Sequence, residues 1–164
     1  MKKETYVKLM DYLRHRKVLK DLIEILYTAL PFVMVVIYPV IIIINGIRGF
    51  DYKFALSILV PGITLAGVYF MRRLINRQRP YEKFETNSLI AKAKKGQSFP
   101  SNHSACGFVI AMAGFTVSPL LGFLLLAVAA LIALTRIFSG VHFISDVLAG
   151  TFIGTLMGIV FIFI

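Results

Sequence analysis

The sequence predicts an all-α protein, a polytopic membrane bundle of about five transmembrane helices preceded by a basic amphipathic helix. Its 164 residues are 58% hydrophobic and only 16% charged, whereas soluble domains carry roughly a quarter charged residues. Apolar stretches of about 18 residues or more recur along the chain, and such stretches are typical of membrane spans. We expect one membrane-embedded domain over residues 1–164, with an interfacial segment at 1–21 and a transmembrane core at 22–164.

The N-terminal segment, residues 4–20, mixes apolar and basic side chains with roughly helical spacing. A basic helix with one apolar face lies in the membrane interface, and the alternative is a solvated basic tail. The first 20 residues lack the apolar core of a signal peptide, so we expect no cleaved signal there.

Five apolar segments follow, separated by polar or turn-forming residues. The first, residues 22–48, contains Pro31 and Pro39, which membrane helices tolerate as kinks. The remaining spans are expected at residues 54–71, 103–118, 120–138 and 147–164.

The connections between the spans differ in length. Two are short loops, at residues 46–53 and 139–146, whereas residues 72–102 form a long polar and basic connection. Within it, residues 82–95 have the composition of a short surface helix. Two spans separate this connection from the loop at 139–146, so both must emerge on the same face of the membrane.

The last span carries Gly150, Gly154 and Gly158 at intervals of four residues. Residues four apart share a face of a helix, and small residues let membrane helices approach closely. The glycines therefore predict tight helix packing. Cys106 is the single cysteine and lies in an apolar stretch, where it is expected to be a small buried hydrophobe; one cysteine forms no internal disulfide.

His142 and Asp146 stand four residues apart, at the start of the last span. A carboxylate beside an imidazole fixes its tautomer and stabilises its protonated form, which prepares the other ring nitrogen to act as a nucleophile or a base. Such a pair on its own is usually a capping or surface pair.

The segment Pro100-Ser101-Asn102-His103 stands where a polar connection meets an apolar helix. Ser101 is a good N-cap, and the free backbone N–H groups of the first helical turn bind anions. His103 would then lie at the mouth of an anion site. The alternatives are simple capping by Ser101 and an interfacial histidine without a role in chemistry.

Arg72, Arg79 and Arg136 are cations beside predicted spans. Arginine binds phosphate oxygens through planar, bidentate hydrogen bonds, but arginines at span ends also extend towards lipid headgroups. We interpret Arg73 and Arg77 in that second way. Arg136 has the strongest case for function, because it lies near the end of an apolar span and six residues before His142.

Together, the three segments resemble the type 2 phosphatidic acid phosphatase family, also called lipid phosphate phosphatases. The family pattern is Lys-x6-Arg-Pro, then Pro-Ser-Gly-His, then Ser-Arg-x5-His-x3-Asp. The resemblance covers roughly residues 54–164 and keeps the order and spacing of the pattern. This chain has Arg72-x6-Arg79-Pro80, then Pro100-Ser101-Asn102-His103, then Thr135-Arg136-x5-His142-x3-Asp146.

The resemblance implies hydrolysis of a lipid phosphomonoester or diphosphate through a phosphohistidine. In that scheme His142 attacks phosphorus while Asp146 orients it, and His103 protonates the leaving oxygen and then activates water. The phosphate oxygens would be held by Arg72, Arg79, Ser101, Asn102 and Arg136. Substrates of this class include phosphatidic acid, phosphatidylglycerol phosphate and undecaprenyl pyrophosphate. No cofactor is implied, and the lack of a carboxylate cluster predicts a metal-independent reaction.

The chain departs from the family pattern at three positions. Arg72 replaces lysine, Asn102 replaces glycine and Thr135 replaces serine. The first two bear on substrate preference, because they change the reach of a cation and the approach of the backbone to phosphate. The alternatives to hydrolysis are transfer of the phosphoryl group to an alcohol by the same site, and a non-catalytic lipid carrier or scaffold.

The charge distribution indicates the partners and the location of the protein. The net charge is +10, but the cations cluster between apolar spans, which favours lipid headgroups and anionic lipid substrates over nucleic acid. Of the 18 Lys and Arg residues, 16 fall on the expected site face, so the positive-inside rule predicts a cytoplasmic site in the cell membrane. The family resemblance implies an extracytoplasmic site. Thiol labelling of one cysteine placed within residues 86–97 distinguishes the two, and the oligomeric state stays open.

Overall fold

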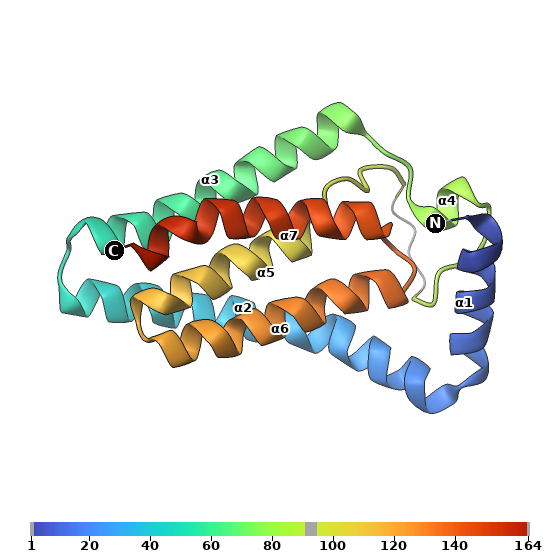
Figure 1. Ribbon diagram of the computed structural model, residues 1–164, viewed down its shortest axis with the longest axis horizontal. Helices are drawn as coiled ribbons and strands as arrows, with labels where there is room; N and C mark the ends of the chain where they lie inside the picture. Colours follow the sequence, from blue (N-terminus) through green and yellow to red (C-terminus); the bar gives the residue numbers. More distant parts are fainter. Residues whose placement is uncertain (1, 91–94, 164) are drawn as a thin grey trace.

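The computed structural model describes residues 2–90 and 95–163, and this part of the chain is helical without any β-strand. Long helices run side by side, and a short N-terminal helix lies across one end of them (Figure 1). The helices, in chain order, are α1 (Lys3–His15), α2 (Lys17–Arg48), α3 (Tyr52–Ile75), α4 (Pro80–Lys83), α5 (Asn102–Ala113), η1 (Gly114–Thr116), α6 (Pro119–Phe138), α7 (Ile144–Gly158) and η2 (Ile159–Ile162).

Four of the described helical segments are long and apolar enough to cross a membrane. They are Lys17–Arg48, Tyr52–Lys83, Pro119–Phe138 and Ile144–Ile162. The span expected at 103–118 is instead divided between α5, with 12 residues, and η1. Twelve helical residues extend about 18 Å, less than the ~30 Å hydrocarbon core. Most residues of this short helix are buried, because it packs against α2, α3, α6 and α7.

Three predicted boundaries change in the structure. The helix expected at 4–20 ends at His15, and α2 begins at Lys17, so the interfacial helix and the first span meet at a bend. A surface helix was expected at 82–95, but among the described residues of that range the helix α4 ends at Lys83. Residues 91–94 of that prediction lie outside the described residues. The loop expected at 139–146 is shorter, because α7 already begins at Ile144.

Local signals explain where the helices begin. The Asp51 side chain accepts hydrogen bonds from the backbone N–H groups of Lys53 and Phe54 and caps α3. Ser118 caps α6 in the same way and is followed by a proline at the first helical position. These caps satisfy donors that the first turn of a helix leaves free, so each span starts at a defined residue.

The glycines of α7 bring it against α5, as predicted. A Cβ atom at Gly150 would collide with the backbone carbonyl oxygen of Ser101, and one at Gly154 with that of Ala105. At Gly158 the obstacle would be the side chain of Met112. The two helices therefore touch backbone to backbone, which places the start of α7 beside the start of α5.

Helix α1 supports the loop between α6 and α7 from the end of the bundle. The Tyr6 hydroxyl donates a hydrogen bond of 3.0 Å to the carbonyl oxygen of Gly140, and burial raises the pKa of Tyr6 to about 12, so the hydroxyl stays protonated. Gly140 has φ of +75°, and a Cβ there would meet Met10 and Tyr6. The loop that precedes His142 is thereby held in one conformation.

Candidate active site

A cavity of about 560 Å³ opens at the end of the bundle that carries α1 and α4. Its polar lining comes from three separate parts of the chain: the end of α3 with the connection after it, the start of α5, and the loop before α7. The sequence-predicted residues that line it are Arg72, Arg79, Asn102, His103 and His142. Residues from all three motif segments are therefore brought to one site at one end of the bundle.

Two buried arginines supply positive charge to this cavity. Arg72, in the last turn of α3, donates from Nη1 to the carbonyl oxygen of Pro100 at 3.1 Å. Arg79 donates from Nε to Gly96 O at 3.1 Å and from Nη1 to Val141 O at 3.3 Å. Backbone carbonyls thus hold both guanidinium groups in position, and their remaining N–H groups are available on the cavity side for an anion.

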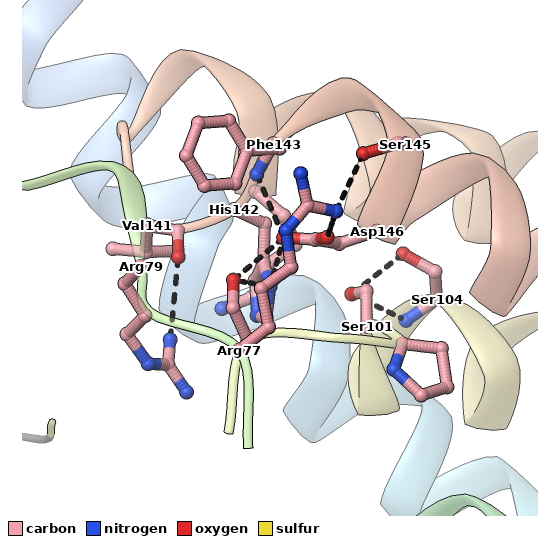
Figure 2. A network of polar contacts seen from close by, with 12 residues as sticks. Arg77, Arg79, Ser101, Ser104, Val141, His142, Phe143, Ser145 and Asp146 are labelled. Atoms are coloured by element: carbon pink, nitrogen blue, oxygen red, sulfur yellow. Dashed lines mark hydrogen bonds and ion pairs between the residues drawn. The ribbon is translucent and has the colours of Figure 1, made fainter. Parts of the chain in front are cut away.

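His142 lines the cavity and Asp146 does not, and both are almost completely buried, at 2% and 0% exposure. His142 Nδ1 is 3.7 Å from Asp146 Oδ2, which is longer than a hydrogen bond. The carboxylate instead accepts the Phe143 backbone N–H at 2.9 Å, so Asp146 also caps the first turn of α7. Figure 2 shows the carboxylate enclosed by donors.

Ser98 closes the gap between this carboxylate and the imidazole. Its Oγ–H donates to Asp146 Oδ2 at 2.5 Å, and the same Oγ lies 3.4 Å from His142 Nδ1. Because the hydroxyl hydrogen is directed to Asp146, Ser98 Oγ can accept from His142 in the tautomer that carries its proton on Nδ1. That arrangement leaves Nε2 without a proton, as a nucleophile requires.

The start of α5 carries Ser101, Asn102 and His103. The Ser101 Oγ accepts from Ser104 N at 3.5 Å and from Ser104 Oγ at 2.9 Å, so it caps α5 as expected. Ser101 is fully buried and is not among the described residues that line the cavity. His103 is exposed and lines the cavity together with Asn102.

Arg136 is placed differently from Arg72 and Arg79. It is 1% exposed and donates from Nη2 to the carbonyl oxygen of Tyr27 at 2.7 Å. Its guanidinium carbon lies 3.6 Å from the centre of the Tyr27 ring, and Tyr27 itself lines the cavity. Within residues 2–90 and 95–163, Arg136 Nε and Nη1 have no hydrogen-bond partner. The buried guanidinium of Arg136 thus lies next to the cavity lining, and its Nε and Nη1 donors have no partner among the described residues.

Arg77 is a further charged residue at the site, and the sequence interpretation had assigned it to lipid headgroups. Its Nη1 lies 2.6 Å from Asp146 Oδ1 and 2.8 Å from Ser145 Oγ. Asp146 is the single acidic residue after Glu85. A lone carboxylate near a membrane span needs a cation as partner, and this feature of the sequence could have indicated a role for Arg77. Ser98 carried no comparable signal, because its role depends on the path of the connection between α4 and α5.

The surroundings of His142 favour its neutral form. Burial lowers the pKa of the imidazole below its ordinary value of 6.5, and the nearby charges of Arg79 and Arg72 act in the same direction. The Asp146 carboxylate opposes them. The direction of this pKa shift matters for the chemistry. A lowered pKa means that the imidazole of His142 is neutral at neutral pH, so that one ring nitrogen carries a free lone pair.

The described residues contain no group of three or more His, Cys, Asp or Glu side chains that could hold a metal ion. The polar side of the cavity is cationic and imidazole-bearing, which suits an anion. A second cavity of about 550 Å³ adjoins it and shares Leu65, Asn102 and His103 with it. The rest of this second lining is almost entirely apolar and comes from α2, α3, α5 and α6.

A bundle with four helical segments long and apolar enough to cross a membrane, and with a cationic cavity at one end, is typical of the class of multi-pass membrane proteins. The sequence model of the PAP2 superfamily matches residues 52–164, and the chain belongs to this superfamily. No curated protein matches the chain at a significant level.

Two solved structures share this fold. The crystal structure of LpxE from Aquifex aeolicus is 27% identical with a TM-score of 0.73, and the match covers 98% of this chain and 94% of that one. The first transmembrane PAP2 type phosphatidylglycerolphosphate phosphatase from Bacillus subtilis has a TM-score of 0.57 over 96% of this chain and 90% of that one. Its identity of 23% shows likeness of fold alone.

Proposed function

We propose that this protein is a membrane lipid phosphatase that hydrolyses a phosphomonoester or diphosphate group of a lipid through a phosphohistidine intermediate. The observation that carries the proposal is the cavity lined by His142, His103, Arg72 and Arg79. A nucleophile, an acid and two fixed cations around one space are what phosphoryl transfer needs, because the reaction depends on positioning and on charge neutralisation.

The first step is attack by His142. Its Nε2 lone pair forms a bond to phosphorus while the bond from phosphorus to the ester or anhydride oxygen breaks, and His103 gives a proton to the departing oxygen. In the second step a water oxygen attacks the phosphohistidine, His103 accepts its proton, and the bond from Nε2 to phosphorus breaks. Arg72 and Arg79 neutralise the charge on the phosphoryl oxygens in both steps.

Arg136 enters this scheme through Tyr27. Its Nε and Nη1 atoms are buried without partners among the described residues, and leaving such donors unsatisfied is costly. We assign Arg136 to the phosphate-binding set, reached when Tyr27 shifts from its position over the guanidinium. Ser101 acts through the structure of the helix start, since its oxygen accepts from Ser104 and it is not among the described residues that line the cavity.

The second, apolar cavity supports a lipid as the substrate. It borders the anion-binding cavity at Leu65, Asn102 and His103, so one molecule can place its phosphate against the arginines and its hydrocarbon chain among the apolar side chains of α2, α3 and α5. Phosphatidic acid, phosphatidylglycerol phosphate and undecaprenyl pyrophosphate all have this shape. His103, at the border of the two cavities, would protonate the ester or anhydride oxygen that leaves the attacked phosphorus.

The test is release of inorganic phosphate from these three lipids by the purified protein in detergent micelles. We expect His142→Ala to reduce kcat by at least about 10³-fold, as removal of a nucleophile does. In a labelling experiment, the wild type should carry a phosphoryl label that is stable in base and labile in acid, and His142→Ala should lack this label. Wild-type activity in His142→Ala would disprove the mechanism. We also expect full activity in excess EDTA, and abolition of activity by the chelator would contradict metal independence.

A further inference from the structure

Arg77 pairs with Asp146 but is outside the set of described residues that line the cavity. Its Nη1 bonds to Asp146 Oδ1 and to Ser145 Oγ, and its guanidinium lies over the ring of Phe143 at 4.5 Å. The three contacts join the connection after α3 to the start of α7 (Figure 2). Arg77 is not among the described residues that line the cavity, so it does not reach a phosphate bound there.

The two oxygens of Asp146 are divided between two tasks. Oδ1 pairs with Arg77 at 2.6 Å, whereas Oδ2 accepts from Ser98 Oγ and from the Phe143 N–H and faces His142 at 3.7 Å. The carboxylate is fully buried, while the Arg77 side chain is 36% exposed. A single cation that water can reach therefore balances the buried anion beside the proposed nucleophile.

We propose that Arg77 is a positioning residue that sets the charge which Asp146 presents to His142, and so keeps the imidazole neutral when the enzyme works. The inference rests on the proposed function, because it treats His142 as the nucleophile. Arg77 acts through Asp146 and touches neither the substrate nor the reacting atoms.

The physical argument is the balance of charges around the imidazole. An uncompensated carboxylate stabilises the imidazolium form and raises the pKa of a histidine, whereas a cation paired with that carboxylate reduces the effect. The other charged groups that face His142 are Arg72 from α3 and Arg79 from the connection after it, with His103 across the cavity on α5. Removing Arg77 leaves these in place and changes only the balance at Asp146.

The experiment measures the titration of His142 directly and through turnover. The variant Arg77→Gln keeps hydrogen-bonding groups without charge, and Arg77→Lys keeps charge without the planar fork. We expect Arg77→Gln to move the His142 imidazole titration, followed by NMR of protein labelled at histidine, to higher pH by about one unit. The acid limb of kcat/KM should move with it while KM stays unchanged. Arg77→Lys should bring the His142 titration most of the way back to its wild-type position.

Lys83→Gln is the matched control. Lys83 is an exposed cation of α4 at the same end of the bundle, so its loss removes one positive charge without touching Asp146. We expect no shift in either titration for this variant. A shift equal to that of Arg77→Gln would mean that the effect is general surface charge, and the proposal would be wrong.

Other outcomes separate a structural role from the proposed one. If Arg77→Gln and Arg77→Lys lose activity equally at every pH while His142 titrates as in wild type, Arg77 only clamps the loops and the inference fails. If Arg77→Gln does not fold, Arg77→Met keeps contact with the Phe143 ring and removes the charge, and an unshifted His142 there overturns the inference. The NMR titration needs no turnover. An inactive wild type with a shifted His142 in Arg77→Gln would therefore count against the proposed function alone.

Discussion

The two ends of the helical bundle both carry charged residues next to membrane spans, but they use them differently. At the end with the candidate active site, Arg72, Arg79 and Asp146 are buried. At the opposite end, around residues 45–53 and 114–118, Arg48 and Asp51 are exposed. Arg48 donates to the carbonyl oxygens of Thr116 and Val117, which end a helical turn.

The comparison shows that a charge at the end of a span says little about function until its burial and its partners are known. At the far end every described contact of Arg48 or Asp51 completes the start or the end of a helix. At the site end the charges are withdrawn from water, which is expensive in or near a membrane, and they converge on one cavity. Three pairs of matched substitutions at the two ends test this difference, and a fourth prediction concerns the pH dependence of the site.

The largest contrast is expected between two carboxylates that both accept backbone N–H groups at helix starts. Asp146→Asn should reduce kcat by roughly 10³-fold, because a neutral amide cannot stabilise the charge that develops on His142. Asp51→Asn should leave kcat within about twofold, because asparagine caps helices as well as aspartate does. Phosphate release by both purified variants is the measurement. A similar loss of kcat in Asp146→Asn and Asp51→Asn would mean that the two ends of the bundle do not differ in function.

Two arginines give the next contrast. Arg79→Ala removes a buried cation from the cavity and should lower kcat/KM by about 10²–10³-fold, as loss of one fixed donor to a transition state does. Arg48→Ala removes an exposed cation from the far end and should alter kcat/KM less than twofold. Circular dichroism of both variants controls for folding, and an active Arg79→Ala protein would exclude Arg79 from the site.

Two hydroxyl groups separate loss of activity from loss of stability. Ser98→Ala breaks the link between Asp146 and His142 and should reduce kcat by about tenfold with little change in KM. Thr116→Ala should lower the free energy of unfolding by about 1–3 kcal/mol and leave kcat unchanged, because it leaves the buried Asn45 amide without its acceptor at 2.8 Å. Thermal unfolding beside initial rates resolves the two. A fall of kcat in Thr116→Ala would contradict the assignment.

The smallest effect concerns pH. Since burial lowers the pKa of His142, the ring binds fewer protons in the folded protein than a free imidazole does at the same pH. The nucleophile therefore persists as the pH falls past 6.5 and is lost only below that value. We expect the acid limb of the profile of kcat/KM against pH to have its midpoint below 6.5. A midpoint above that value would show that Asp146 outweighs burial.

The arrangement of the spans follows from local sequence information, and for that reason most of it was predictable. The caps at Asp51 and Ser101 and the proline after Ser118 mark helix starts that depend only on neighbouring residues. The alternation of spans then places both motif segments at one end. The length of α5 was not predictable in this way, because its enclosure depends on packing against α6 and α7.

The interior of the site depends on contacts between distant segments, and there the sequence interpretation was incomplete. Arg77 and Ser98 meet Asp146 across 69 and 48 residues, through connections with no regular spacing. Arg136 was expected in the phosphate clamp, but its place beneath Tyr27 depends on a contact 109 residues away. Spacing within a motif cannot report contacts between segments so far apart in the sequence.

The glycine-to-carbonyl contacts between α7 and α5 have a mechanical consequence. Gly150 and Gly154, four residues apart along α7, face the backbone oxygens of Ser101 and Ala105. These two close contacts fix the position of α7 along α5. Any sliding of α7 by less than a full turn, about 5.4 Å, would drive side chains rather than glycines into those oxygens. The geometry of the candidate site is therefore constrained outside the cavity, by backbone atoms that take no part in the proposed chemistry.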